Sequence, residues 1–322
     1  MSFTEIASFD VVHGHLSWPW ISFDPSGKRF AFASSATVVA SRALDDGAVT
    51  EGASFTLPPD LGADVQAFAL GCEGTLLAVT GAGVIVTCDA SGEVARARVD
   101  ALAGPGFTGR ALAFDRSGSR LWLSAESEKE TALLLLAGRT LDVLGTARSA
   151  AFPPPAMHEL MLHPVDDAVL LLAACGEEGT FARVAGWSGG EVSAIATTLD
   201  GGGIPAGFVG FSADGARVHL AEADELRTHA WPGLEELSSV ELADDFVSSF
   251  AGAVLGDSIL VDGQDAESNE DQVMKFDRSA IVGSVIYEDV PSGMWAGRLG
   301  ASAIVTVESK GDPARGRVIR AP

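Results

Sequence analysis

Residues 21–34 read ISFDPSGKRFAFAS, and this stretch decides the fold. Apolar and polar residues alternate on either side of a Pro-Ser-Gly turn, which is typical of two antiparallel strands joined by a tight hairpin. The same pattern returns as ALAFDRSGSRLWLSA at residues 111–125 and as VGFSADGARVHLAE at residues 209–222. Weaker copies are AFALGCEGTLLAVT at residues 67–80 and LMLHPVDDAVLLLAA at residues 160–174. The chain is therefore built from a repeated hairpin.

The turns of these hairpins set the length of the repeat. Their glycines are Gly27, Gly74, Gly118 and Gly215, which are 47, 44 and 97 residues apart, and the last interval is close to two repeats. Such turns require a positive φ angle, which glycine adopts at little cost and aspartate tolerates. In the fourth copy the sequence Val-Asp-Asp at residues 165–167 is expected to take the place of the missing glycine.

Each repeat contains four strand-like runs in about 45 residues, the size of one blade of a β-propeller. The predicted blades cover residues 18–57, 66–100, 110–146, 157–199, 208–242, 248–289 and 294–322. The last of them has only three such runs, whereas residues 3–11 form a strand without a hairpin partner nearby. We therefore predict an all-β fold in a single domain of residues 1–322: a seven-bladed β-propeller of four-stranded antiparallel blades. The N-terminal strand closes the last blade, so that no sheet edge is left open.

The chain resembles the bacterial WD40-like and YVTN-type seven-bladed propellers over essentially its whole length. The resemblance is carried by Phe-Asp-Pro-Ser-Gly at residues 23–27, Phe-Asp-Arg-Ser-Gly at 114–118 and Phe-Ser-Ala-Asp-Gly at 211–215. It implies a platform fold whose members bind proteins, peptides, sugars or cofactors. The function must therefore be argued from the site itself.

The composition restricts the possible partners. The chain has 44 acidic and 21 basic residues and a net charge of −23, a field that repels nucleic acid and anionic membrane surfaces. No apolar run reaches the roughly 18 residues of a membrane helix, and the first residues do not form a secretory signal. Cys72, Cys88 and Cys175 are too few and too scattered for a disulfide framework or a zinc knuckle. We expect a cytoplasmic protein with three reduced thiols.

Several short motifs invite a chemical interpretation. Ser188 stands in a Gly-x-Ser-x-Gly sequence, but its context is a turn between strands, whereas a nucleophile elbow leads into a helix. His13 and His15 could share a metal if both rings faced one way, but no third ligand is indicated. The acidic run at residues 262–271 lacks the spacing of a calcium loop and is expected to be a solvated loop. The sequence therefore assigns no metal and no cofactor.

An enzyme is the competing class, in the form of a lactonase-like hydrolase with its site at the mouth of the axial channel. Innermost strands of a propeller begin near that channel, so His158, beside Glu159, could act as a general base. Arg110 begins the third blade and could orient a carboxylate. The alternatives are a hydrogen-bonded core histidine and, for the whole chain, a structural subunit of a larger complex.

Aromatic and acidic residues favour a binding function. The aromatic residues in or beside the connections between blades could be exposed anchors or could pack between the sheets. The loops between second and third strands share one end of a propeller and are rich in acids. The predicted partner-binding residues are Trp18, Trp20, Phe107, Arg110, Phe152, His158, Phe208, Phe246, Trp295, Glu126, Glu128, Glu177, Glu178, Asp224, Asp265, Glu267, Glu270 and Asp271. We predict a non-catalytic platform for a protein or peptide, and we expect that partner to be basic.

Overall fold

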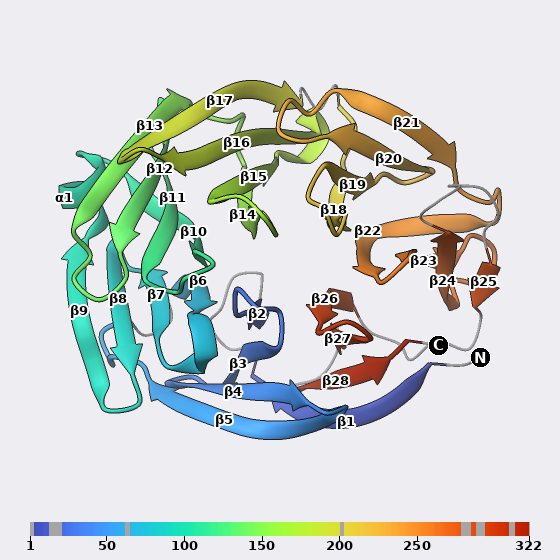
Figure 1. The fold of residues 1–322 in the computed structure, drawn as a ribbon, viewed down its shortest axis with the longest axis horizontal. Coiled ribbons are helices and arrows are strands. Elements are labelled where there is room, and N and C mark those ends of the chain that lie inside the picture. The colour runs from blue at the N-terminus through green and yellow to red at the C-terminus, as the bar shows by residue number, and fades with distance from the viewer. Residues whose placement is uncertain are drawn as a thin grey trace.

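The computed structural model describes residues 3–12, 21–61, 65–199, 203–277, 285–287, 294–308 and 313–321. Seven four-stranded antiparallel sheets stand around a common centre like the blades of a propeller (Figure 1). The predicted all-β, seven-bladed architecture is confirmed. No helix in the described part of the chain is long and apolar enough to cross a membrane.

The strands follow one another from the centre outward in blades 1 to 3. Blade 1 contains β2 (Ile21–Phe23), β3 (Arg29–Ser35), β4 (Val38–Asp45) and β5 (Ala48–Thr56). Blade 2 contains β6 (Val65–Leu70), β7 (Leu77–Gly81), β8 (Val84–Asp89) and β9 (Gly92–Arg98). Blade 3 contains β10 (Thr108–Phe114), β11 (Arg120–Glu126), β12 (Glu130–Ala137) and β13 (Val143–Ala150).

Blades 4 to 6 repeat this order. Blade 4 contains β14 (Met157–Leu162), β15 (Ala168–Ala174), β16 (Thr180–Ser188) and β17 (Glu191–Leu199). Blade 5 contains β18 (Gly207–Phe211), β19 (Arg217–Ala221), β20 (Glu225–Ala230) and β21 (Glu236–Glu241). Blade 6 contains β22 (Phe246–Leu255), β23 (Ser258–Asp265), β24 (Asp271–Asp277) and β25 (Val285–Tyr287).

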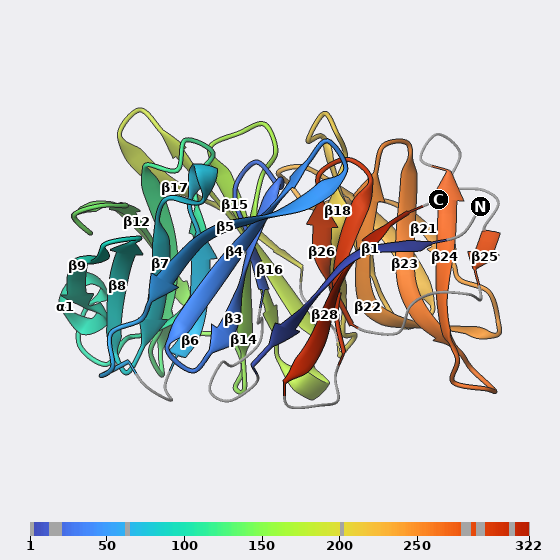
Figure 2. The ribbon, with the colours of Figure 1, turned by 90° about the horizontal axis from the view of Figure 1, so that it is seen from below.

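Blade 7 combines the two ends of the chain. It contains β26 (Met294–Leu299), β27 (Ala303–Val307), β28 (Ala314–Arg320) and, as its outermost strand, β1 (Thr4–Val11). Strand β1 runs antiparallel to β28, from Thr4 opposite Arg320 to Val11 opposite Ala314 (Figure 2). The prediction that the N-terminal strand closes the last blade is confirmed.

Side-chain acceptors hold the turn between the first two strands in several blades. The Asp24 carboxylate accepts the backbone N–H groups of Lys28 and Arg29 at 3.0 and 2.9 Å. Asp115 binds the corresponding groups in blade 3, and Ser212 accepts the Arg217 N–H in blade 5. These buried side chains explain why Phe-Asp or Phe-Ser precedes the turn in blades 1, 3 and 5.

Blade 4 forms this turn differently from the prediction. Asp166 and Asp167 are not among the residues with positive φ, so they do not replace the missing glycine conformation. Instead, His163 Nδ1 accepts the N–H groups of Val165 and Asp166 at 3.3 and 2.8 Å, and its Nε2 lies 2.9 Å from the Gly215 carbonyl oxygen. An imidazole can bridge two blades in this way because it has two polar nitrogens.

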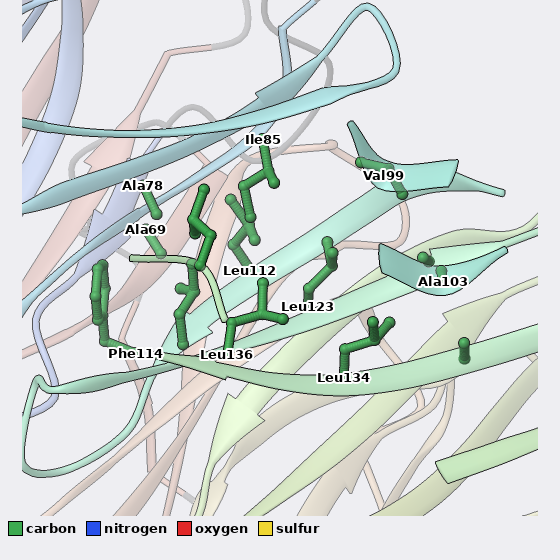
Figure 3. Close-up of a cluster of buried hydrophobic side chains, with 14 of the residues drawn as sticks. Ala69, Ala78, Ile85, Val99, Ala103, Leu112, Phe114, Leu123, Leu134 and Leu136 are labelled. Carbon is green, nitrogen blue, oxygen red and sulfur yellow. The ribbon is translucent and has the colours of Figure 1, made fainter. Parts of the chain in front are cut away.

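The core lies between neighbouring blades. One cluster joins blades 2 and 3 through Ile85, Leu112, Leu123 and Leu134, which are all buried (Figure 3). A short helix that the repeat pattern did not indicate, α1 (Val99–Ala103), covers this cluster with Val99 and Ala103. Cys72, Cys88 and Cys175 are free thiols, and the last two are buried.

The antiparallel order gives the ring two different ends, which lie at the top and bottom of the edge-on view in Figure 2. The loop end carries the loops between second and third strands and the connections between blades. The turn end carries the first-to-second and third-to-fourth turns. All predicted partner-binding loops therefore belong to the loop end.

Candidate functional site

The predicted residues Arg110, Glu126 and His158 come together at the loop end, where blade 3 meets blade 4. Glu126 is the last residue of β11, and His158 is the second residue of β14. His158 Nε2 lies 3.5 Å from one Glu126 oxygen, and Arg110 Nε lies 3.3 Å from the other. His158 Nδ1 lies 2.8 Å from the Ser124 hydroxyl oxygen. This cluster of Arg110, Ser124, Glu126 and His158 is called the Glu126 cluster below.

Strand geometry explains how the Glu126 cluster forms. Ser124 and Glu126 are two residues apart on β11, so their side chains lie on the same face of the blade 3 sheet. His158 reaches them from the innermost strand of blade 4. The centre of its ring lies 5.3 Å from the centre of the Phe152 ring, in an edge-to-face arrangement. Adjacent strand residues point to opposite faces, so Glu159 does not accompany His158 into the cluster. The structure therefore unites Arg110 and His158 through Glu126 and leaves Glu159 outside.

The electrostatics of the cluster favour an ionised Glu126. Burial alone raises the pKa of this carboxyl, but the contact with His158 and the charge of Arg110 outweigh it and lower the pKa below its ordinary value. Burial, reinforced by the charge of Glu126, raises the pKa of the nearby Cys175 thiol. Cys175 is therefore an unreactive buried thiol.

Arg183 borders the cluster and was not singled out in the sequence. Its guanidinium group lies 3.8 Å from the centre of the Phe152 ring and donates a hydrogen bond to the Ser149 hydroxyl. Burial lowers the pKa of Arg183. Because Ser149 belongs to blade 3 and Arg183 to blade 4, the contact fastens two blades together. Only the three-dimensional pairing of blades could have revealed it.

Ser124, His158 and Glu126 stand in the order of a hydrolase triad, yet the arrangement is a buried one. The Ser124 side chain is completely buried, and His158 is buried as well. A catalytic nucleophile must be accessible to the carbonyl carbon that it attacks. The chemistry that this arrangement supports is hydrogen bonding between two blades.

The predicted aromatic anchors pack mainly between blades. Phe107, Phe152, Phe246 and Trp295 are buried in four different clusters of the core. Phe208 is half-buried and contacts Phe211 edge-on at 5.3 Å. The side chains of these five residues therefore do not form an exposed anchor surface. They lie at the start of a blade or in the connection just before it, where side chains pack between neighbouring sheets. The last two predicted aromatic residues, Trp18 and Trp20, lie outside the described residues.

The predicted acidic residues, in contrast, are largely at the surface. Glu128, Glu177, Glu178, Asp224, Glu267 and Glu270 are exposed, and Asp265 and Asp271 are half-buried. Asp244 and Asp245, in the connection to blade 6, are exposed as well. We call the following eight residues the acidic surface: Glu128, Glu177, Glu178, Asp224, Asp244, Asp245, Glu267 and Glu270.

The acidic surface is uncompensated within the described residues. None of its eight carboxylates takes part in an ion pair with the bases that the structure describes. Lys129 is the single base in the described loops and connections of the loop end. The described turns of the turn end also carry exposed acids, but three exposed bases lie among them: Lys28, Arg116 and Arg139. The loop end is therefore the more strongly negative of the two.

The remaining motifs do not form sites in the described chain. Ser188 ends β16, and the two-residue turn that follows leads into β17, as a hairpin does. Residues 266–270 form the loop between β23 and β24, and no group of three metal-ligating side chains occurs in the described ranges. His13 and His15 lie outside the described residues.

Comparison with solved structures identifies the type of propeller. The propeller domain of Cps50 (Swd1) from Myceliophteria thermophila superposes over all of both chains, with a TM-score of 0.64 and 9% sequence identity. The WD40 domain of SCAP from fission yeast gives a TM-score of 0.60 at 11% identity, over 96% of this chain and 82% of that one. The fold is a seven-bladed WD40-type propeller.

At these identities the WD40-type likeness concerns the fold alone. No protein-family model matches the sequence, and no relative was found among curated proteins. The function of this WD40-type chain must accordingly be argued from its own surface.

Proposed function

We propose that the protein is a non-catalytic platform whose loop end binds a basic segment of another protein. Propellers of the WD40 type typically serve as protein-interaction platforms, which supports the general function. The observation that carries the specific proposal is the acidic surface, whose carboxylates lack ion pairs with the described residues. Such a field attracts Lys- and Arg-rich segments and speeds their encounter.

The acids of blades 4 and 5 suit a direct test. Glu177, Glu178 and Asp224 are exposed, and none of the three makes a described side-chain hydrogen bond that a substitution would break. The loop-end variant combines Glu177→Lys, Glu178→Lys and Asp224→Lys.

A matched control exists at the turn end. Glu191, Glu235 and Asp257 are exposed, lie in or beside turns, and likewise have no ion pair in the described part of the chain. The turn-end variant combines Glu191→Lys, Glu235→Lys and Asp257→Lys, so it changes the net charge by the same amount. Any difference between the two variants is then an effect of position rather than of total charge.

The probe is a short synthetic peptide of Lys, Gly and Ser, and the measurement is its Kd at low and physiological salt. We expect the loop-end variant to bind it about tenfold more weakly than the parent, and the turn-end variant within about threefold. The affinity of the parent should fall as salt rises, because the attraction is screened. Equal losses in both variants, or no binding by the parent, would refute the proposal.

A further inference from the structure

We propose that the loop end also recognises bulky apolar side chains in its basic partner, through Met157, Ile204 and Val247. The inference rests on the proposed function, because it states what else the bound basic segment must carry. These three side chains are called the apolar arc below.

The members of the apolar arc are unusually exposed for their type. Met157 is 62% exposed, Val247 is 47% exposed and Ile204 is 42% exposed. The other large hydrophobic side chains that are exposed in the described chain lie on outermost strands or at the turn end: Val94, Val143, Leu144, Leu237 and Val165. An outermost strand has one side without a neighbour, so exposure there needs no further explanation.

The arc follows the centre of the ring across three consecutive blades. Met157 is the first residue of β14, and Val247 is the second residue of β22. Ile204 lies in the connection that leads into β18. Strands β14, β18 and β22 are the innermost strands of blades 4, 5 and 6 and border the upper side of the centre in Figure 1. The three side chains therefore lie at the loop end, where each of these blades begins.

Backbone pairing places the acidic surface directly beside the arc in blade 4. Met157 pairs with Ala174, which leads into the β15–β16 loop that carries Glu177 and Glu178. On the other side of that loop, the Ile204 carbonyl accepts the Thr180 N–H at 3.1 Å, and the Gly203 N–H donates to the Glu178 carbonyl at 3.2 Å. The loop that carries Glu177 and Glu178 thus lies between the backbone segments that carry Met157 and Ile204.

The same arrangement recurs between blades 5 and 6. The N–H of Ser248, which follows Val247 in β22, donates to the Ala223 carbonyl oxygen at 3.1 Å. Ala223 precedes Asp224 in the β19–β20 loop, and the Asp224 carbonyl accepts the Leu242 N–H at 2.8 Å. Val247 is therefore next to a member of the acidic surface.

This alternation defines the chemistry of the partner. Protein interfaces place apolar contacts within a polar rim, and exposed apolar side chains beside exposed carboxylates match that composition. The carboxylates select Lys and Arg, whereas Met157, Ile204 and Val247 gain only from contact with apolar groups. Met157 is also flexible enough to adapt to different shapes. The partner segment therefore combines basic residues with Leu, Ile, Met or Phe.

The test compares two peptides of equal charge. One is the polar peptide of Lys, Gly and Ser, and in the other several serines are replaced by leucine. We expect the parent to bind the leucine peptide at least about tenfold more tightly, since burying a large apolar side chain is worth that factor. The variant Met157→Ser with Val247→Ser should lose this advantage and keep its Kd for the polar peptide.

The control variant is Leu144→Ser with Leu237→Ser, which changes two exposed leucines on the outermost strands β13 and β21. It should retain the preference for the leucine peptide. Equal binding of both peptides by the parent, or an unchanged preference in the Met157 and Val247 variant, would overturn the apolar arc and leave the acidic platform standing. Failure of both peptides to bind would overturn the platform and the arc together.

Discussion

At the scale of single residues, Asp262 is the most unusual carboxyl group in the structure. It lies on β23 between β22 and β24, is buried, and its Oδ2 atom contacts the Ser249 hydroxyl. Burial raises the pKa of Asp262 to about 8, and the charge of Asp271 adds to this, while the Ser249 contact opposes it. Folded Asp262 is therefore protonated at neutral pH, whereas the unfolded chain has released that proton.

This difference makes stability depend on pH. Between about pH 4 and pH 8 the folded state holds one proton more at Asp262 than the unfolded state, so the free energy of unfolding falls as pH rises. We expect Asp262→Asn to remove this loss and to raise Tm at pH 9 by several °C, with little change at pH 4. Asp265→Asn is the control, because backbone hydrogen bonds from Ser268 and Glu267 lower the pKa of Asp265. If Asp262→Asn lowered Tm at pH 9, the folded protein would favour the ionised carboxyl, and burial would not raise the pKa of Asp262.

Sequence reasoning succeeded at residues whose role is local. Asp24 and Asp115 precede turn glycines, and their repetition identified the hairpins that the structure shows. It failed at the blade 4 turn, where Asp166 and Asp167 do not replace the glycine and His163 accepts the N–H groups instead, because nothing in a sequence shows which acceptor reaches an N–H group. Ser124 was missed for a related reason, since its partner His158 belongs to the next blade.

At the scale of elements, β1 is the strand on which closure of the ring depends. It provides Phe9 and Val11 to the core of blade 7. The centre of the Phe9 ring lies 5.2 and 4.4 Å from the ring centres of Phe30 and Phe32 of blade 1. Counting strands was enough to predict this closure, since one end of the chain lacked a strand and the other had one to spare. The short helix α1 escaped prediction because its five residues are too few to show a helical period.

We expect deletion of residues 1–12 to lower Tm by far more than a surface change would. Loss of the Phe9 side chain alone should cost about 3–5 kcal/mol, and the deletion also exposes the edge of β28. The control is a circular permutant that begins at residue 13 and carries residues 1–12 after residue 322 through a short linker. Thr4 lies opposite Arg320, so the new connection is a hairpin and the permutant should melt near the parent. A deletion variant with the parental Tm would contradict the role of β1 in closure.

At the scale of the whole molecule, the two ends of the ring differ in their exposed charge. Sequence reasoning placed the acidic loops at one end, because an antiparallel blade sends alternate loops to opposite ends. It did not separate the exposed acids from the buried aromatic residues, of which Phe152 packs against Arg183 between two blades. Exposure depends on how neighbouring sheets wedge together, and no single repeat contains that information.

The central claim is that the loop end, and not acidity in general, receives a basic partner. The most direct measurement is photo-crosslinking of the leucine-containing basic peptide, with a benzophenone at its centre, followed by mass spectrometric mapping of the attachment sites. The account predicts attachment beside the acidic surface and the apolar arc, around Met157, Ile204 and Val247, and its loss in the loop-end variant. Attachment at the turn end around Glu191 and Asp257, or at both ends in proportion to their exposed acids, would contradict it.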